Sequence, residues 1–234
     1  MGRNLTTNVI LVLIQMNELL EIIWLSLQVS GTALLISTII GVPFGLWIGL
    51  KRFPGRRLVA ALLYTGMGFP PVVIGLVVYL MLSRNGWFGS LNFSFMPELF
   101  TPAAMILAQI IIALPLVAGF TMAAVMGVDP DLRTQVLSLG ATSRQAAWAV
   151  LLEARVGVLV AIIAGFGSII SEVGAVMLVG GNIAGRTRVL TTAIVLDTRR
   201  GAFNQALILG GVLLFLAFTA NLLMLRLQGR RFDE

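Results

Sequence analysis

The chain has 234 residues, of which 58% are hydrophobic and only 11% are charged, and its mean hydropathy is +0.99. A soluble domain carries about a quarter charged residues, so these charges are too few to cover a globular surface in water. The composition therefore predicts an integral membrane protein. Arginines in cytoplasmic loops explain the net charge of +6 more simply than nucleic-acid binding does, so we expect no nucleic-acid partner.

The residue types that are missing exclude several kinds of chemistry. The sequence contains no Cys and no His, which excludes thiolate nucleophiles, Ser-His relays, disulfides and Cys/His zinc sites. The only lysine, Lys51, follows leucine, so a phosphate loop ending in Gly-Lys-Ser/Thr is absent. We therefore expect a chain that is not an enzyme and binds no metal or cofactor. An intramembrane hydrolase is close to excluded on the same grounds.

Five apolar runs are long enough to cross a bilayer, which takes roughly 20 residues. These runs are Ile22 to Leu50, Leu58 to Leu82, Pro102 to Val128, Val156 to Val179, and Ala206 to Leu225. A shorter run, Val9 to Met16, lies in an N-terminal segment (residues 1–21) that we expect to form an interfacial helix. The predicted fold is an all-α integral membrane domain of residues 22–225, with five core transmembrane helices and a tail of residues 226–234.

The distribution of basic residues predicts how the spans are oriented. Residues 51–57, residues 129–155 and the C-terminal tail together hold 10 of the 16 basic residues, and the opposite side holds 6. The positive-inside rule therefore places the C-terminus in the cytoplasm and the N-terminus outside the cytoplasmic membrane. Four outer arginines between the last two spans oppose this trend, which suggests that their loop has a reason to be basic.

The polar stretch of residues 129–155 predicts a helix–glycine–helix elbow between the third and fourth spans. Asp129 before Pro130 indicates an N-cap followed by proline at the first helical position. Gly140 ends this helix, and Ser143 can cap a second one. A simple connection needs only a handful of residues, so we expect the elbow to be a docking surface for a soluble partner.

Prolines and glycines interrupt the spans at ordered positions. Adjacent Pro70 and Pro71 predict a break that exposes backbone to a water-filled path, whereas single prolines in other spans indicate simple kinks. Gly41, Gly45 and Gly49 form a ladder that allows close helix approach. The ladder is equally compatible with packing inside one subunit and with a dimer interface.

Three stretches carry a family resemblance. Residues 129–143 resemble the cytoplasmic EAA loop of ABC importer permeases, with Gly140 at the glycine of that loop and Thr134, Gln135 and Val136 at its Glu-Ala-Ala positions. Residues 171–188, which read SEVGAVM and then GGNIAGRTR, resemble the GEFGA…GNIPG-T segment of molybdate and sulfate permeases. The variant found here is most similar to the tungstate branch, and residues 69–75 also resemble oxyanion permeases.

The resemblance implies a type I ABC importer permease that forms a homodimer. It also implies two copies of an ABC ATPase subunit that uses ATP, an extracytoplasmic substrate-binding protein, and an oxyanion substrate. Tungstate is the expected oxyanion, with molybdate and sulfate as alternatives. A stand-alone secondary carrier or channel is the rival class, but the five spans show no convincing inverted repeat and the elbow would then lack a partner.

The candidate site residues fall into three groups. The coupling loop is expected to present Asp131, Thr134, Gln135, Leu139, Gly140, Ala141, Thr142 and Ser143 to the ATPase. The translocation path or gate is expected to include Pro70, Pro71, Ser171, Glu172, Gly174, Gly180, Gly181 and Asn182, with free backbone amides as anion donors. Arg186 and Arg188 are expected either to attract the anion or binding protein, or to form an ordinary solvated loop.

Glu172 is the only acid deep in a predicted span. An intramembrane carboxylate is costly and is usually paired or functional, but it would repel a dianionic substrate. We therefore expect a structural or gating role through an ion pair or hydrogen bond with Arg84, Arg186 or the second subunit.

Overall fold

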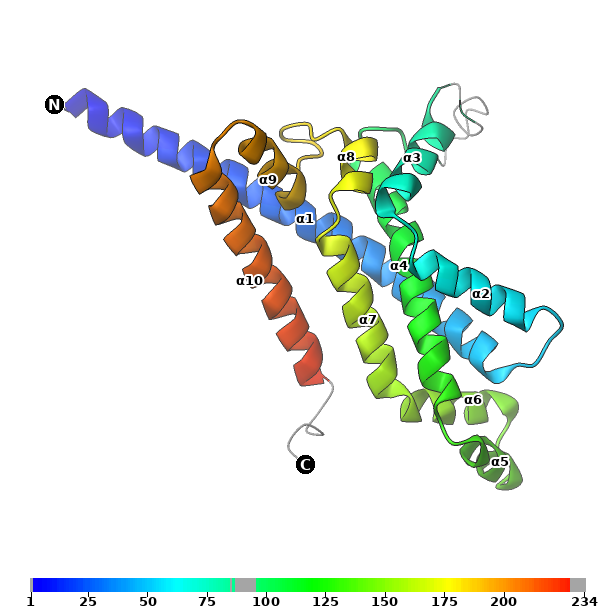
Figure 1. The fold of residues 1–234 in the computed structure, drawn as a ribbon. Helices are drawn as coiled ribbons and strands as arrows, with labels where there is room; N and C mark the ends of the chain where they lie inside the picture. Colours follow the sequence, from blue (N-terminus) through cyan, green and yellow to red (C-terminus); the bar gives the residue numbers. More distant parts are fainter. Residues whose placement is uncertain (1, 85, 87–95, 228–234) are drawn as a thin grey trace.

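The computed structural model describes the backbone of residues 2–84, 86 and 96–227, and the side chains of residues 16–84, 86 and 96–226. All regular secondary structure within these ranges is helical, as the composition predicts (Figure 1). The helices are α1 (Gly2–Leu50), α2 (Arg56–Met67), α3 (Pro71–Leu82), α4 (Pro102–Met126), α5 (Pro130–Ser138), α6 (Ser143–Glu153), α7 (Arg155–Ile170), α8 (Gly174–Gly180), α9 (Leu190–Arg199) and α10 (Phe203–Leu227).

The lengths and composition of these helices fit a membrane protein. In the described part of the chain, α1, α4 and α10 are each long and apolar enough to cross a membrane. Two bent pairs, α2–α3 and α6–α7, pass the same test together, which raises the number of candidate spans to as many as five. The predicted all-α membrane fold is therefore confirmed.

The N-terminal helix continues into the first span. We expected an interfacial helix in residues 1–21 that leads into this span, and α1 runs without interruption from Gly2 to Leu50, with Pro43 inside it. Asn17 and Glu18, which follow the short apolar run, cost little in a helix interior. No change in structure therefore marks residue 21.

Two spans are broken, and only one break was predicted. The axes of α2 and α3 differ by 101° because Pro70 is extended and Pro71, which has no N–H, starts a new helix. The second break, at residues 171–173 between α7 and α8, interrupts a run that was predicted to be continuous. Gly167, Ser171 and Ala175 follow one another at four-residue intervals in the sequence, but the break places Gly167 in α7 and Ala175 in α8.

The glycine ladder packs inside the subunit. A Cβ atom added to Gly49 would lie 2.7 Å from Val125 Cγ1, and one added to Gly41 would lie 3.1 Å from Val117 Cγ1. The same construction on Gly45 meets the carbonyl oxygen of Ala118. All three glycines therefore face α4, and α1 and α4 form the most extensive helix contact in the described part of the chain.

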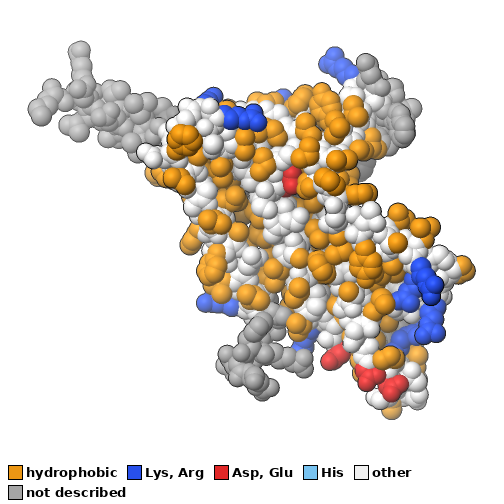
Figure 2. All heavy atoms as spheres, viewed as in Figure 1, with side chains coloured by type: hydrophobic (Ala, Val, Ile, Leu, Met, Phe, Trp, Pro, Cys, Tyr) orange, Lys and Arg blue, Asp and Glu red, His pale blue; other side chains and the backbone are white. Residues whose placement is uncertain are grey.

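The ends of the bundle carry different features. Figure 1 places the elbow α5–α6 at the opposite end of α4 and α7 from α3 and α8. Hydrophobic side chains cover the middle of the face in Figure 2, whereas the charged side chains visible there lie mainly toward its two ends. The core between the ends is apolar, with contributions from α1, α3, α4, α7 and α8.

Candidate functional site

The half-helices that follow the two breaks pack against each other. A Cβ atom on Gly75 of α3 would lie 2.5 Å from the Cα of Ala175 on α8, so the two backbones touch at this point. One turn away, Val72 in the first turn of α3 fills the space beside Gly174, the first residue of α8. The fold thus brings the predicted path residues of the second and fourth spans together.

Glu172 bonds to the start of α8 and not to an arginine. Its Oε1 atom accepts a hydrogen bond of 2.9 Å from the backbone N–H of Ala175, and its carbonyl oxygen accepts one of 2.9 Å from the hydroxyl of Thr191. Neither Arg84 nor Arg186 pairs with it among the side chains that the structure describes. The expected ion pair within this subunit is therefore wrong, and the carboxylate satisfies a buried backbone amide instead.

Hydrogen bonds of Thr187 hold the turn after α8 in place. The hydroxyl of Thr187, which is completely buried, accepts a 3.0 Å hydrogen bond from the N–H of Ile183 and donates to the carbonyl of Gly180. The N–H of Gly181 bonds to Met177. The amide of Gly181, which was expected to be free for an anion, is therefore already used.

The remaining path residues are placed as follows. Gly181 and Asn182 both have positive φ, of 71° and 52°, and form the tight turn after α8. Ser171 is exposed, but its hydroxyl donates to the carbonyl of Gly167 at 2.7 Å, one turn back. The polar groups in this region therefore bond mainly to nearby backbone.

Gln109 is a residue that sequence reasoning missed. It lies in the middle of α4, is 3% exposed, and donates a 3.1 Å hydrogen bond from Nε2 to the carbonyl of Ile169 at the end of α7. Its position at the second break suggests that it fixes where α7 stops. A single glutamine in an otherwise apolar span was the signal available in the sequence.

The predicted basic loop contains a helix. We expected residues 186–200 to form a loop, but Leu190–Arg199 forms α9, whose first N–H donates to the hydroxyl of Ser26 on α1 at 2.8 Å. Leu190 and Ala193 pack with Ile22 of α1 and with α10. The apolar residues at 190, 193 and 194 were the signal for this helix.

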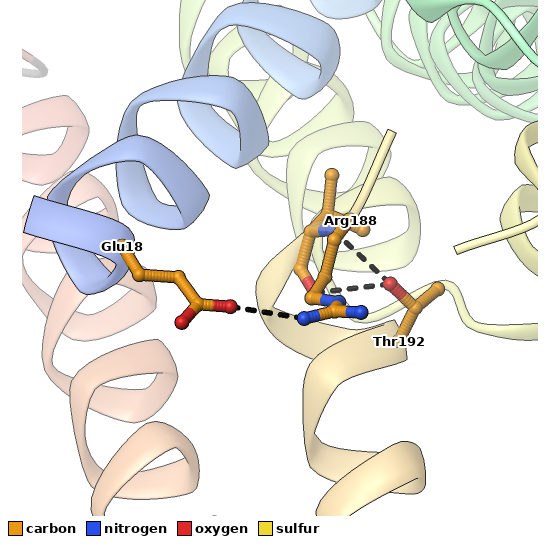
Figure 3. A network of polar contacts seen from close by, with 4 residues as sticks. Glu18, Arg188 and Thr192 are labelled. Atoms are coloured by element: carbon orange, nitrogen blue, oxygen red, sulfur yellow. Dashed lines mark hydrogen bonds and ion pairs between the residues drawn. The ribbon is translucent and has the colours of Figure 1, made fainter. Parts of the chain in front are cut away.

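The two arginines before α9 have different environments. Arg188 forms an ion pair of 2.9 Å with Glu18 of α1, and its side chain is only 16% exposed (Figure 3). Arg186 is exposed. Figure 3 also shows Thr192 in the first turn of α9, where its hydroxyl bonds to the backbone of Val189. Of these two arginines, Arg186 is therefore the one exposed at the surface, whereas Arg188 is mostly buried and paired with Glu18.

The elbow forms with the predicted start and turn. Asp129 caps α5 by accepting a 2.9 Å hydrogen bond from the N–H of Asp131, and Gly140 takes a φ of 90° in the turn. The cap of α6 is Thr142 rather than Ser143, because Thr142 and Gln145 form a reciprocal capping box. Glutamine three residues after a threonine was the signal that the prediction overlooked.

The elbow presents apolar side chains beside polar ones. None of the predicted coupling residues is buried; they are Asp131, Thr134, Gln135, Leu139, Gly140, Ala141, Thr142 and Ser143. Leu139 is 88% exposed at the turn, and Trp148 is 60% exposed on α6. A large apolar side chain so fully exposed next to caps and charges is typical of a protein-binding surface.

The sequence of the chain matches a known family of membrane proteins. The family model described as "Binding-protein-dependent transport system inner membrane component" matches residues 41–233. The chain belongs to this family. The match begins at the glycine ladder and includes both broken spans and the elbow.

Individual relatives agree with the family. The chain is 42% identical over 222 residues to a probable anion ABC transporter permease protein of Haloferax volcanii, covering 93% of this chain and 94% of that protein. It is 38% identical to the tungstate uptake system permease protein TupB of Peptoclostridium acidaminophilum, covering 90% of each. A solved structure of the MetNI methionine ABC transporter in an inward-facing conformation shares the fold, with a TM-score of 0.71, 20% identity, and coverage of 92% of this chain and 98% of that one.

Proposed function

We propose that this chain is the permease subunit of an ABC importer that moves tungstate across the cytoplasmic membrane. The observation that carries the proposal is the near full-length similarity to a tungstate permease, which spans 90% of both chains. The second relative, named as an anion permease, covers still more of the chain. A tetrahedral oxyanion is therefore the substrate class, and tungstate is the member to test first.

The energy for transport comes from a partner in this proposal. The elbow α5–α6 docks on an ABC ATPase subunit, with Leu139 entering a groove of the partner and the polar coupling residues around it. Its 88% exposure and its place at the tip of the turn support this role. ATP binding and hydrolysis on the partner would then move the elbow. Because α4 and α7 are joined to the elbow, this movement would also shift the two broken spans.

The path itself lies between two copies of the chain. On α3, Val72, Leu76 and Leu80 lie four residues apart and leave an apolar stripe that is 47–55% exposed. This stripe starts at the Pro70–Pro71 break and borders Gly174 of α8. A second copy would cover the stripe and place two pairs of breaks around one axis, which supports a homodimer with a shared path.

The outer end receives the anion from a separate binding protein. Exposed Arg186 follows the turn after α8, and this loop lies at the end of the bundle away from the elbow. With the elbow in the cytoplasm, the N-terminus is outside and the C-terminus is inside. In this arrangement Glu172 acts as the cap that fixes α8 beside the path and makes no contact with the anion.

One experiment tests the proposal against its alternatives. The permease, its ATPase and its binding protein are reconstituted in liposomes, and ATP hydrolysis is measured with tungstate, molybdate or sulfate. We expect tungstate to give the largest stimulation and uptake to require the ATPase. Stimulation by sulfate alone would refute tungstate as the substrate, and uptake by the permease without the ATPase would refute the ABC mechanism.

A further inference from the structure

A cavity of about 450 Å³ lies between α1, α9 and α10, away from the broken spans and from the elbow. One part of its wall is apolar and is formed by Leu19, Ile22, Leu196, Ile208 and Leu209. The other part is charged and contains Glu18, Arg188, Asp197 and Arg200, with Gln205 at the rim. The cavity thus combines an apolar wall with two guanidinium and two carboxylate groups.

The charged groups of the cavity include a buried hydrogen-bond donor that has no partner. Glu18 engages one end of the Arg188 guanidinium, while the Nε atom of Arg188 is buried and has no hydrogen-bond partner in the structure. Arg200 is exposed and follows the last turn of α9 as its C-cap, with half-buried Asp197 three residues before it. A ligand that offers both an acceptor and a donor would satisfy these groups better than a simple anion would.

The surroundings place the cavity at the level of lipid headgroups. Trp24 on α1 and Phe203 at the start of α10 are 69% and 61% exposed, as aromatic side chains at a membrane interface are. From Leu207 onward α10 exposes an apolar face to its surroundings. The boundary between headgroups and hydrocarbon therefore passes close to this cavity, whose apolar wall includes Ile208 and Leu209 of α10.

We propose that this cavity binds the headgroup of a phospholipid that carries a primary ammonium, such as phosphatidylethanolamine. The phosphate lies between Arg188 and Arg200, and the ammonium donates to Asp197. The glycerol and the first methylenes lie against Leu19 and Ile208. Charge complementarity favours this ligand, because two acids in the wall balance two arginines and so match a zwitterion rather than an anion.

Two kinds of ligand could place a phosphate-like group in the cavity: a lipid headgroup and a free tetrahedral oxyanion. The cavity favours the lipid, because a free dianion would gain nothing from the apolar wall and would be repelled by the two carboxylates. A bound lipid would join α1, α9 and α10, three helices that meet around this cavity. It would thereby steady the outer loop that holds Arg186.

Native mass spectrometry of the purified full-length protein tests the proposal. Delipidated protein is titrated with phosphatidylethanolamine, phosphatidylcholine or phosphatidylglycerol, and bound lipids are counted per chain. We expect one tightly held phosphatidylethanolamine, bound about tenfold more strongly than the other two lipids, because only it donates hydrogen bonds from a charged ammonium and also carries a phosphate. Equal binding of the three lipids would overturn the proposal.

Variants and a competing anion locate the site. Gln205→Trp blocks the rim from an exposed position, and Arg200→Gln removes a charge without touching the Glu18–Arg188 pair; each should weaken phosphatidylethanolamine binding about tenfold. Asn204→Trp and Arg186→Gln are the matched controls and should leave it unchanged. Unchanged binding in Gln205→Trp would overturn the location. Displacement of the lipid by millimolar tungstate would assign the cavity to the free oxyanion and refute the lipid.

Discussion

Removing the carboxylate of Glu172 should loosen α8 without unfolding the protein. The side chain accepts a hydrogen bond from the N–H of Ala175, a residue that is completely buried. Replacing Glu172 with Ala leaves this N–H without its partner, which costs about 1–3 kcal/mol and overlaps the range for losing a helix cap. Replacing it with Gln keeps an oxygen acceptor but removes the charge, so the loss should be about half as large.

Hydrogen–deuterium exchange of the peptide that spans α8 measures this effect. A loss of 1.4 kcal/mol corresponds to a factor of ten, so the α8 amides of the alanine variant should exchange about tenfold faster. The glutamine variant should fall between it and the wild type. Glu21→Ala, which removes an exposed carboxylate on α1, is the control and should leave the exchange of α8 unchanged.

Two results would refute the reasoning. Wild-type exchange in the alanine variant would show that the capping bond does not hold α8. Equal acceleration in the glutamine and alanine variants would show that the charge itself is needed, as in an ion pair with a second subunit. In the same variants, weaker anion-dependent stimulation of the ATPase would connect the position of α8 to transport.

Three further predictions concern the ladder, the elbow and the outer turn. Gly45→Ala should lower the free energy of unfolding by about 1–3 kcal/mol in thermal denaturation, because the added methyl group meets the backbone of α4. Gly31→Ala is the control and should leave the free energy of unfolding unchanged, because Gly31 has open space around it. Equal effects of the two substitutions would refute the packing of Gly45 on α4. Leu139→Asp should abolish co-purification with the ATPase at unchanged thermal stability, and retained binding would contradict docking at the turn. Thr187→Val should lower the melting temperature by removing two buried hydrogen bonds, and an unchanged value would show that the turn does not depend on them.

The parts of the fold that follow from local chemistry were predictable. Pro70 and Pro71 fix a helix break by their own geometry, and Asp129 with Pro130 defines a helix start in the same way. Gly140 was identifiable because the turn needs a positive φ, which glycine adopts without strain. The presence of the spans and of the elbow required no information about neighbouring helices.

The parts that depend on tertiary partners were not predictable. The break before α8 forms where the Glu172 carboxylate accepts a hydrogen bond from the N–H of Ala175, and where Gln109 from another helix reaches Ile169. The sequence shows these two polar residues in apolar runs, but it does not show which backbone groups they bond. The glycine ladder showed a stripe but could not show that α4 covers it, because spacing gives the face of a helix and not its neighbour. Thr187 lies in the stretch that resembles oxyanion permeases, but the sequence does not show its bonds to Ile183 and Gly180.

The length of α1 has a mechanical consequence. Its glycines at positions 41 to 49 are locked against α4, and Glu18 on the same helix is paired with the segment that leads into α9. The two attachment points, Glu18 and Gly49, are separated by about 45 Å along the helix axis. A stiff rod of this length converts a tilt of about 5° at one attachment into a displacement of about 4 Å at the other. Movement begun beside the elbow can therefore be carried by α1 to the opposite rim of the molecule, together with the core residues Val29 and Ala33 that this helix contributes in between.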